Sequence, residues 1–207
     1  MPGFRTMFLG EPSWRGVGVH PLAGVHDMHA ALPDAQIDWV VETSSARLLA
    51  QCAGLHRVIP CEIRRWRKSF WAAATRAEWR AFKVQLQQEA YDAVIDLQGL
   101  AKSALVARLA RVTPGGQRFA LANQTDGSGY EAPTRWVADV AFHIEPHIPA
   151  VQRSRELAAH ALGHPAWPGI AHGHDGRRAR QHTCTGGAVQ DSPRCYKDST
   201  CQHRDAM

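Results

Sequence analysis

The order of apolar and amphipathic runs is the feature that most constrains the fold of this chain. Four short apolar runs have the length and composition of buried strands: IDWVVE (37–42), HRVIPCEI (56–63), YDAVIDLQG (91–99) and RFALAN (118–123). Stretches with helical periodicity alternate with them: ARLLAQCAGL (46–55), FWAAATRAEWRAFKVQLQQEA (70–90), LAKSALVARLAR (100–111) and part of 146–163. Strands that alternate with helices and are apolar on both faces predict an α/β fold with a parallel, doubly wound, Rossmann-like sheet.

The two ends of the chain differ from this regular middle. Residues 1–26 are interrupted by glycine and proline, and only TMFL (6–9) has the character of a short strand. Residues 167–207 contain no Leu, Phe or Glu and have no helical or strand period, so we expect this tail to be disordered. The sequence therefore predicts one organised unit over 27–166, between a divergent N-terminus and a disordered tail.

Charge and cysteine usage narrow the class of protein. The formal net charge of +5 suggests an anionic partner without identifying it, because phosphorylated ligands, nucleic acids and anionic membranes all attract such a chain. No window approaches the ~20 consecutive apolar residues of a membrane span. Five cysteines, an odd number, do not form a disulfide framework. A reducing cytoplasmic location is the simplest expectation.

The segment RRWRK (64–68) places four cations in five residues directly after a predicted strand. In a parallel sheet this position lies at the carboxyl edge, where ligands bind. Arg64, Arg65, Arg67 and Lys68 can hold phosphate or carboxylate groups, since a guanidinium donates two parallel hydrogen bonds to such anions. Two interpretations stay open: an anion site, or the solvated start of a helix. Cations are poorly placed at a helix N-terminus, which favours the anion site slightly.

A second candidate follows the next predicted strand, YDAVIDLQG. Asp96, Gln98 and Gly99 stand between this strand and a helix, the usual place of a ligand crevice in an open α/β sheet. Gly99 allows a tight turn, and Asp96 can either face a ligand or only cap the next helix. The segment is not a GxGxxG fingerprint and predicts no dinucleotide.

No cofactor and no metal ion are predicted. The histidines and cysteines of the tail lack the closely spaced CxxC pairs of structural zinc sites. The basic run GRRAR (176–180) has no aromatic residues around it and gives only a weak indication of nucleic-acid binding. No Walker A loop, HExxH or GxSxG motif is present.

Taken together, these motifs resemble a known family. IDWVVE, HRVIPCEIRRWRKSFW, YDAVIDLQGLAKSALVARLAR, ANQTDGSGYE and AVQRSREL follow one another as in the N-terminal domain of the lipopolysaccharide heptosyltransferase I group of glycosyltransferase family 9. The resemblance covers about residues 25–166. It implies the N-terminal half of a GT-B fold, in which two Rossmann-like domains face each other across a cleft.

The resemblance also implies substrates and site residues. The family transfers heptose, with inversion, from ADP-heptose to Kdo in Kdo2-lipid A, and its N-terminal domain holds the acceptor. Its basic loop corresponds to Arg64, Arg65, Arg67 and Lys68, which implies that these cations bind the acidic acceptor. Arg153 remains in the last helix and, with Asp96, Gln98 and Gly99, is expected to line the cleft. Because the acceptor is a membrane glycolipid, peripheral contact with the cytoplasmic face of the inner membrane is implied.

Several positions depart from the family pattern. The aspartate proposed as general base in the family aligns with Val17 in SWRGVGVH, and neither His20 nor Asp27 can be assumed to replace it, so no catalytic residue is assigned. Pro149 stands where the family often has histidine. Beyond residue 166 the resemblance ends and no donor domain follows, so we expect both ends to be read out of frame. We therefore expect a truncated heptosyltransferase-like protein with little or no activity, and marginal folding because a damaged first strand would open the sheet.

Two other functions remain as alternatives. The chain could be a non-catalytic module that binds an acidic glycolipid or a membrane surface through residues 64–68. A nucleic-acid binder ranks last, because the basic residues form no recognisable nucleic-acid motif.

Overall fold

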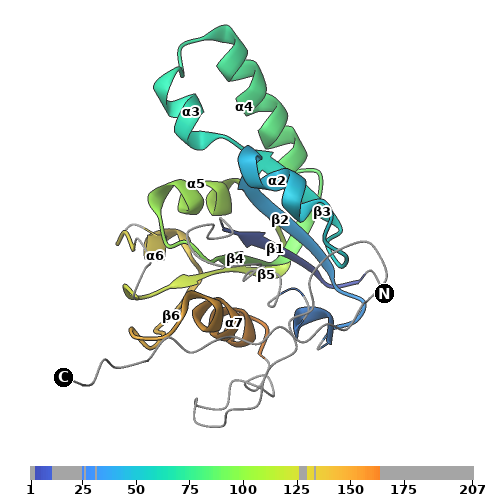
Figure 1. The fold of residues 1–207 in the computed structure, drawn as a ribbon, viewed down its shortest axis with the longest axis vertical. Coiled ribbons are helices and arrows are strands. Elements are labelled where there is room, and N and C mark those ends of the chain that lie inside the picture. Colours follow the sequence, from blue (N-terminus) through green and yellow to red (C-terminus); the bar gives the residue numbers. More distant parts are fainter. Residues whose placement is uncertain are drawn as a thin grey trace, which may run out of the picture.

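A six-stranded, entirely parallel sheet forms the centre of the molecule (Figure 1). The computed structural model describes residues 3–10, 25, 27–30, 32–125, 130–132 and 134–163. Across the sheet the strands are β3 (Arg57–Cys61), β2 (Gln36–Glu42), β1 (Arg5–Leu9), β4 (Ala90–Asp96), β5 (Arg111–Leu121) and β6 (Val140–Phe142). This 3-2-1-4-5-6 order is that of a Rossmann-type sheet, as predicted, and its strand order reverses between β1 and β4.

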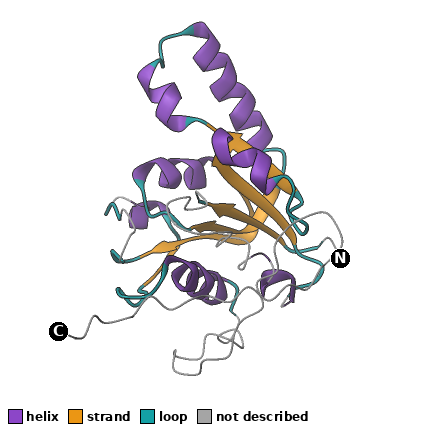
Figure 2. Ribbon diagram, viewed as in Figure 1, coloured by secondary structure: helices purple, strands orange, loops and turns teal. Residues whose placement is uncertain are grey.

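Helices cover both faces of the sheet (Figure 2). They are α2 (Thr43–Leu49), α3 (Ile63–Lys68), α4 (Ala73–Leu86), α5 (Ala101–Leu109), α6 (Thr134–Val137) and α7 (Ala150–Ala161). Successive residues of β1 enter different cores: Phe8 packs with Leu157 of α7, whereas Met7 and Leu9 pack with Phe82 of α4. Both faces of each central strand are thereby removed from water, which explains the continuous apolar runs in the sequence.

The first strand is intact, and the expectation that it is damaged is wrong. Thr6 through Leu9 pair in register with Ile37 through Val40 on one side and with β4 on the other. Met7 is fully buried between these neighbours. Four consecutive apolar or β-branched residues were enough to fill the central position of the sheet, so the physical reason for expecting marginal folding disappears.

Element boundaries differ from the sequence prediction where local signals conflict. The basic segment is not a loop before one long helix: it forms the short helix α3, and a turn over 69–72 separates it from α4. β5 begins at Arg111 rather than 118, and it passes through two glycines, of which Gly115 has a positive φ of 90°. These glycines coincide with a register shift against β4, a sheet irregularity that glycine commonly marks.

Both divergent ends lie mainly outside the described residues. This applies to 11–24, which include Val17 and His20, and to the whole tail 167–207, for which disorder was expected. Helical residues at 27–30 precede Pro33, in agreement with a helix that stops near this proline. Within the described part of the chain, no helix has the length and hydropathy needed to cross a membrane.

Candidate functional site

The basic helix α3 starts at the carboxyl edge of the sheet. β3 ends at Cys61, and the backbone N–H of Trp66 donates to the Glu62 carbonyl at 2.9 Å, which closes the first turn of the helix. The predicted position of the cations after a strand is therefore confirmed, although they stand on a helix. Helical geometry places these side chains on different faces, so the segment does not act as one uniform patch.

Trp66 belongs to the core and is not a ligand-facing side chain. It is 6% exposed, and its ring meets Trp79 edge-on at 5.5 Å and Phe82 at 5.3 Å between centroids. Its indole N–H donates to Glu78 at 2.8 Å. This aromatic cluster fixes α3 against α4 and leaves the neighbouring cations to point elsewhere.

Arg65 is engaged by two carboxylates. Its guanidinium donates to Glu62 and to Glu78, one from the residue before the helix and the other from α4. The hydrogen bonds from Arg65 and then from Trp66 hold the pKa of Glu78 below its usual value. Arg65 therefore joins the two helices, and we assign it a positioning role rather than direct contact with an anion.

The remaining three cations of α3 are exposed at the surface. Arg64 has a side chain that is 66% exposed, and its Nε lies 3.8 Å from the Glu42 carboxylate. Arg67 and Lys68 are exposed and contact no carboxylate of the described residues. Three exposed cations on one short helix can neutralise a ligand with several negative charges.

A small pocket lies beside α3, beyond the carboxyl ends of β1 and β2. Its volume is about 30 Å³, room for only a few water molecules. The polar side chains on its wall are Glu42, Gln98, Lys102 and Ser103, and Cys61 and Ile63 are among the apolar ones. Glu42 lies 3.8 Å from both Lys102 Nζ and Arg64 Nε, so one carboxylate links α3 to α5 across the pocket.

Of the residues predicted after β4, only Gln98 lines this pocket. Asp96 is 2% exposed and accepts hydrogen bonds from the backbone N–H groups of Gln98 (2.9 Å) and Gly99 (3.2 Å) and from the Ser103 hydroxyl (2.8 Å). Burial raises the pKa of Asp96 to about 6, although these hydrogen bonds lower it. Gly99 has a φ of 68°, which explains the glycine. Asp96 and Gly99 shape the loop that presents Gln98.

Arg153 lies on α7, on the opposite face of the sheet from α3, and is absent from the wall of the pocket. It is 7% exposed, and its Nη1 donates to Thr125 Oγ1 at 3.1 Å. Burial lowers its pKa. On the same helix Arg155 forms an ion pair with Asp27. Asp27 is thus committed to a contact within the fold.

Metal binding finds no support in the described part of the chain. None of its His, Cys, Asp and Glu side chains gather in groups of three that could hold an ion. The tail histidines and cysteines fall outside the described residues. The absence of a cofactor and of a metal remains a prediction from the sequence.

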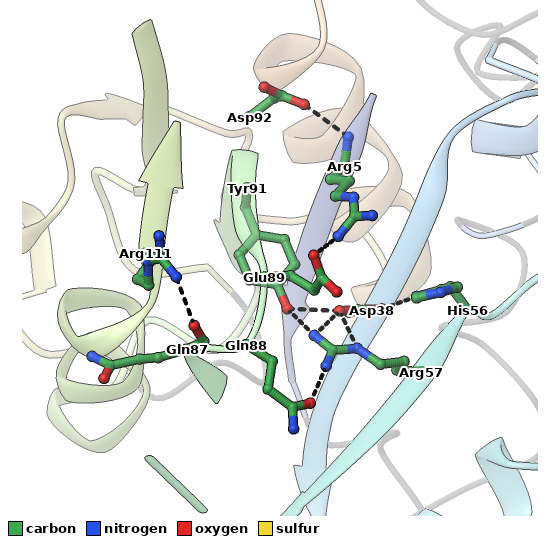
Figure 3. A network of polar contacts seen from close by, with 10 residues as sticks. All are labelled: Arg5, Asp38, His56, Arg57, Gln87, Gln88, Glu89, Tyr91, Asp92 and Arg111. Atoms are coloured by element: carbon green, nitrogen blue, oxygen red, sulfur yellow. Dashed lines mark hydrogen bonds and ion pairs between the residues drawn. The ribbon is translucent and has the colours of Figure 1, made fainter. Parts of the chain in front are cut away.

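A second polar cluster occupies the amino edge of the sheet, opposite the pocket (Figure 3). Asp38 of β2 receives hydrogen bonds from Arg57 Nε at 2.9 Å, Arg57 Nη2 at 2.6 Å and the Tyr91 hydroxyl at 2.6 Å, and His56 lies 3.0 Å away. Burial alone would raise the pKa of Asp38, but the hydrogen bonds from Arg57, Tyr91 and His56 outweigh it and lower the pKa. Because Arg57 and Tyr91 both donate to Asp38 within the cluster, we interpret it as structural.

Sequence reasoning missed two residues of the carboxyl edge, Glu42 and Lys102. The rule that ligands bind beyond the carboxyl ends of parallel strands, which singled out Gln98, could have found both residues. Glu42 is the last residue of β2, and Lys102 stands in the first turn of the helix after β4. Their contact joins residues 60 positions apart, and no sequence pattern shows it.

Comparison with known proteins gives a consistent result. The profile of glycosyltransferase family 9 (heptosyltransferase) matches residues 79–193 and thus continues past residue 166. Lipopolysaccharide heptosyltransferase 1 of Escherichia coli (strain K12) is 42% identical over 159 residues, which are 76% of this chain and 48% of that protein. The protein of the same name from Pseudomonas aeruginosa is 38% identical over 159 residues, 77% of this chain and 43% of its own length. The chain spans about half the length of these curated relatives.

Solved structures give the same picture. E. coli heptosyltransferase WaaC with ADP superposes with a TM-score of 0.66 at 34% identity, over 79% of this chain and 49% of that one. E. coli ADP-heptose lps heptosyltransferase II superposes with a TM-score of 0.53 at 22% identity, over 80% and 46%, which supports the fold alone.

Proposed function

The chain belongs to glycosyltransferase family 9, and on this premise we propose that it is a heptosyltransferase-like protein with little or no activity by itself. The reaction is the transfer of heptose from ADP-heptose to the Kdo sugar of Kdo2-lipid A. The described residues hold the acceptor. The observation that carries the proposal is the helix α3, which extends Arg64, Arg67 and Lys68 into solvent beside the pocket at the carboxyl edge. The acceptor is a membrane glycolipid, so the protein works in peripheral contact with the cytoplasmic face of the inner membrane.

The chemistry of the acceptor suits these cations. Kdo carries a carboxylate and lipid A carries phosphates, and guanidinium groups bind both kinds of anion through paired hydrogen bonds. Gln98, on the pocket wall, can donate to and accept from a sugar hydroxyl. Lys102 adds a further positive charge to the same wall. The edge therefore offers both charge neutralisation and hydroxyl recognition to an acidic sugar.

The residues of the site divide into contact and positioning roles. We assign contact with the acceptor to Arg64, Arg67, Lys68 and Gln98. Arg65 positions α3 through Glu62 and Glu78, and Asp96 holds the loop that carries Gln98. No described carboxylate is assigned as general base, and with Val17 at the aligned position we expect no turnover of ADP-heptose and Kdo2-lipid A by this chain. Turnover above background would contradict that expectation.

Binding of the acceptor headgroup tests the proposal directly. Deacylated Kdo2-lipid A keeps the charged sugars and phosphates but has no acyl chains, and calorimetric titration of the full chain measures its affinity. Replacing Arg64, Arg67 and Lys68 by Gln together removes three charges, and we expect binding to weaken at least about tenfold. The matched control replaces Arg80, Lys83 and Arg108, three exposed cations outside α3, by Gln.

The control variant should retain its affinity, because it loses the same net charge at other places. Equal weakening in both variants would mean that only overall charge attracts the ligand, and the site on α3 would be rejected. Unchanged binding by the α3 variant would reject it as well. The alternative function, a non-catalytic module for an acidic glycolipid, predicts the same binding of the headgroup, and turnover above background would exclude it.

A further inference from the structure

The turn over 69–72, between α3 and α4, carries two adjacent aromatic residues, Phe70 and Trp71, to which the proposed site assigns no role. The two helices stand out from the sheet as an arm, with this turn at its tip (Figure 1). Phe70 is 51% exposed and Trp71 is 86% exposed. Large aromatic side chains usually bury 150–250 Å² each in cores and interfaces, so such exposure at a projecting point marks a contact surface.

The tip is held in shape by its own hydrogen bonds. The N–H of Ala72 donates to the Ser69 carbonyl at 3.0 Å, and the hydroxyls of Ser69 and Thr75 are 3.0 Å apart. Thr75 is buried beneath the turn. The rings of Phe70 and Trp71 meet edge-on at 6.1 Å. The aromatic pair is thus presented outward by an ordered turn, and contact does not require the backbone to fold first.

The composition around the tip is apolar and cationic. Residues 63–77 contain five cations and no carboxylate. The nearest carboxylates on either side, Glu62 and Glu78, are both engaged by Arg65. Ala72, Ala73 and Ala74 are exposed and extend the apolar surface beside Trp71. Exposed aromatic side chains with basic residues beside them are complementary to a partner that has an apolar interior beneath an anionic surface.

We propose that Phe70 and Trp71 insert into the headgroup region of an anionic phospholipid bilayer, with the net positive charge of residues 63–77 facing the anionic headgroups. Tryptophan prefers the boundary between headgroups and acyl chains. Each basic residue near an anionic leaflet strengthens binding about fivefold. The inference rests on the exposed tip and not on sugar transfer, but it deepens the proposed function by naming the surface that meets the membrane.

Membrane contact at this tip would bring the pocket to its substrate. α3 has six residues and is about 9 Å long at 1.5 Å per residue, and its first turn adjoins the pocket. The helix thus connects the inserted tip to the carboxyl edge of the sheet. A glycolipid headgroup rising from the bilayer would then meet Arg64 and Gln98 without leaving the membrane.

Vesicle binding tests the inference without any lipid A. The full chain is sedimented with phosphatidylcholine vesicles that contain or lack phosphatidylglycerol. We expect binding only to the anionic vesicles, and we expect Trp71→Ala to weaken it at least about tenfold, because the apolar contact is lost. Trp136→Ala is the matched control, since Trp136 on α6 is likewise exposed, at 76%, and lies outside the tip.

Each result supports or overturns the inference. Loss of binding in Trp71→Ala but not in Trp136→Ala, with retention in Trp71→Phe, supports insertion. No binding to anionic vesicles, or equal binding by Trp71→Ala, overturns it. So does self-association that Trp71→Ala abolishes, since the tip would then meet a second copy of the chain. Affinity for the deacylated acceptor should stay unchanged in Trp71→Ala, which separates this test from that of the proposed function.

Discussion

Two aspartates with the same burial occupy opposite edges of the sheet, and their pKa values are shifted in opposite directions. Asp38 at the amino edge and Asp96 at the carboxyl edge are each 2% exposed. The pKa of Asp38 lies below its usual value, because the hydrogen bonds from Arg57, Tyr91 and His56 outweigh burial. Burial raises the pKa of Asp96 to about 6, since its hydrogen-bond donors are neutral. Burial alone therefore does not decide the charge of a carboxyl group; the partner does.

The two edges also use their arginines differently. At the amino edge Arg57 donates to Asp38, Gln88 and Tyr91, and its side chain is only 21% exposed. At the carboxyl edge the buried carboxyl is satisfied by backbone and hydroxyl groups. Arg65 pairs with Glu62 and Glu78, whereas Arg64, Arg67 and Lys68 of the same helix stay exposed. The charges of the amino edge therefore stabilise the fold, and the exposed cations of α3 are the physical basis for proposing the site at the carboxyl edge.

Asp38→Asn should have the largest effect on stability. The change leaves the buried end of Arg57 without its counter-charge, and breaking a buried ion pair typically costs about 3–5 kcal/mol. Urea unfolding followed by circular dichroism measures the loss. The same change at the other edge, Asp96→Asn, is the control, and because Asp96 has no cation in hydrogen-bond contact we expect a smaller loss. Equal losses would remove the contrast between the edges.

The pH dependence of stability should show the two aspartates separately. The folded pKa of Asp96 is raised to about 6, so its contribution to stability is complete below about pH 4 and declines as pH rises to about 6, by on the order of 3 kcal/mol. The folded pKa of Asp38 is lowered, so its contribution is present above about pH 4 and is lost as pH falls further. When the unfolding free energy is measured as a function of pH, it should therefore pass through a maximum near about pH 4.

The two aspartate variants show which aspartate causes the loss of stability on each side of that maximum. Asp96→Asn should flatten the decline between about pH 4 and pH 6, and Asp38→Asn should flatten the loss on the acid side. A decline that persists in Asp96→Asn would mean that another group titrates in this window.

Tyr91→Phe should cause an intermediate loss. The Tyr91 hydroxyl donates to Asp38 at 2.6 Å and accepts from Arg57 at 2.8 Å, but the ion pair between those two residues remains when the hydroxyl is removed. We expect a loss of about 1.5–3 kcal/mol, the usual contribution of a hydrogen bond to a charged group. Thermal melts at neutral pH measure it. A loss as large as that of Asp38→Asn would show that the tyrosine, not the ion pair, is the main support of the amino edge.

Arg65→Gln should change stability least. Its side chain and that of Glu78 are 52% and 42% exposed, and water screens such pairs. The packing of Trp66 against α4 remains in the variant. We expect an unchanged melting midpoint together with weaker binding of deacylated Kdo2-lipid A, but less weakening than in the triple variant of Arg64, Arg67 and Lys68. A clear drop in melting temperature would show that Arg65 belongs with Arg57 as a structural arginine.

Much of the fold followed from the sequence because apolar periodicity reports burial directly. The runs at 37–42 and 91–96 became central strands, and the parallel α/β class was correct. The state of the first strand was misjudged, since a five-residue strand between glycine-rich segments carries little periodic signal. For the site, strand order placed Arg64 and Gln98 at the ligand-binding edge, but adjacency in sequence suggested that all four cations act together, and helical geometry separates Arg65 from the others.

The sequence by itself determined the layers of this protein, the carboxyl edge of the sheet as the position of the basic segment, and the positive charge found there. These properties depend on local composition and on the order of elements, which the chain carries along its length. Only the tertiary structure decided which cations remain exposed, which tryptophan is core and which is exposed, and in which direction the pKa of each buried aspartate moves. Several of those outcomes depend on distant partners, such as Glu78, 12 positions from Trp66, and Glu42, 60 positions from Lys102, and contacts at that range are set by packing.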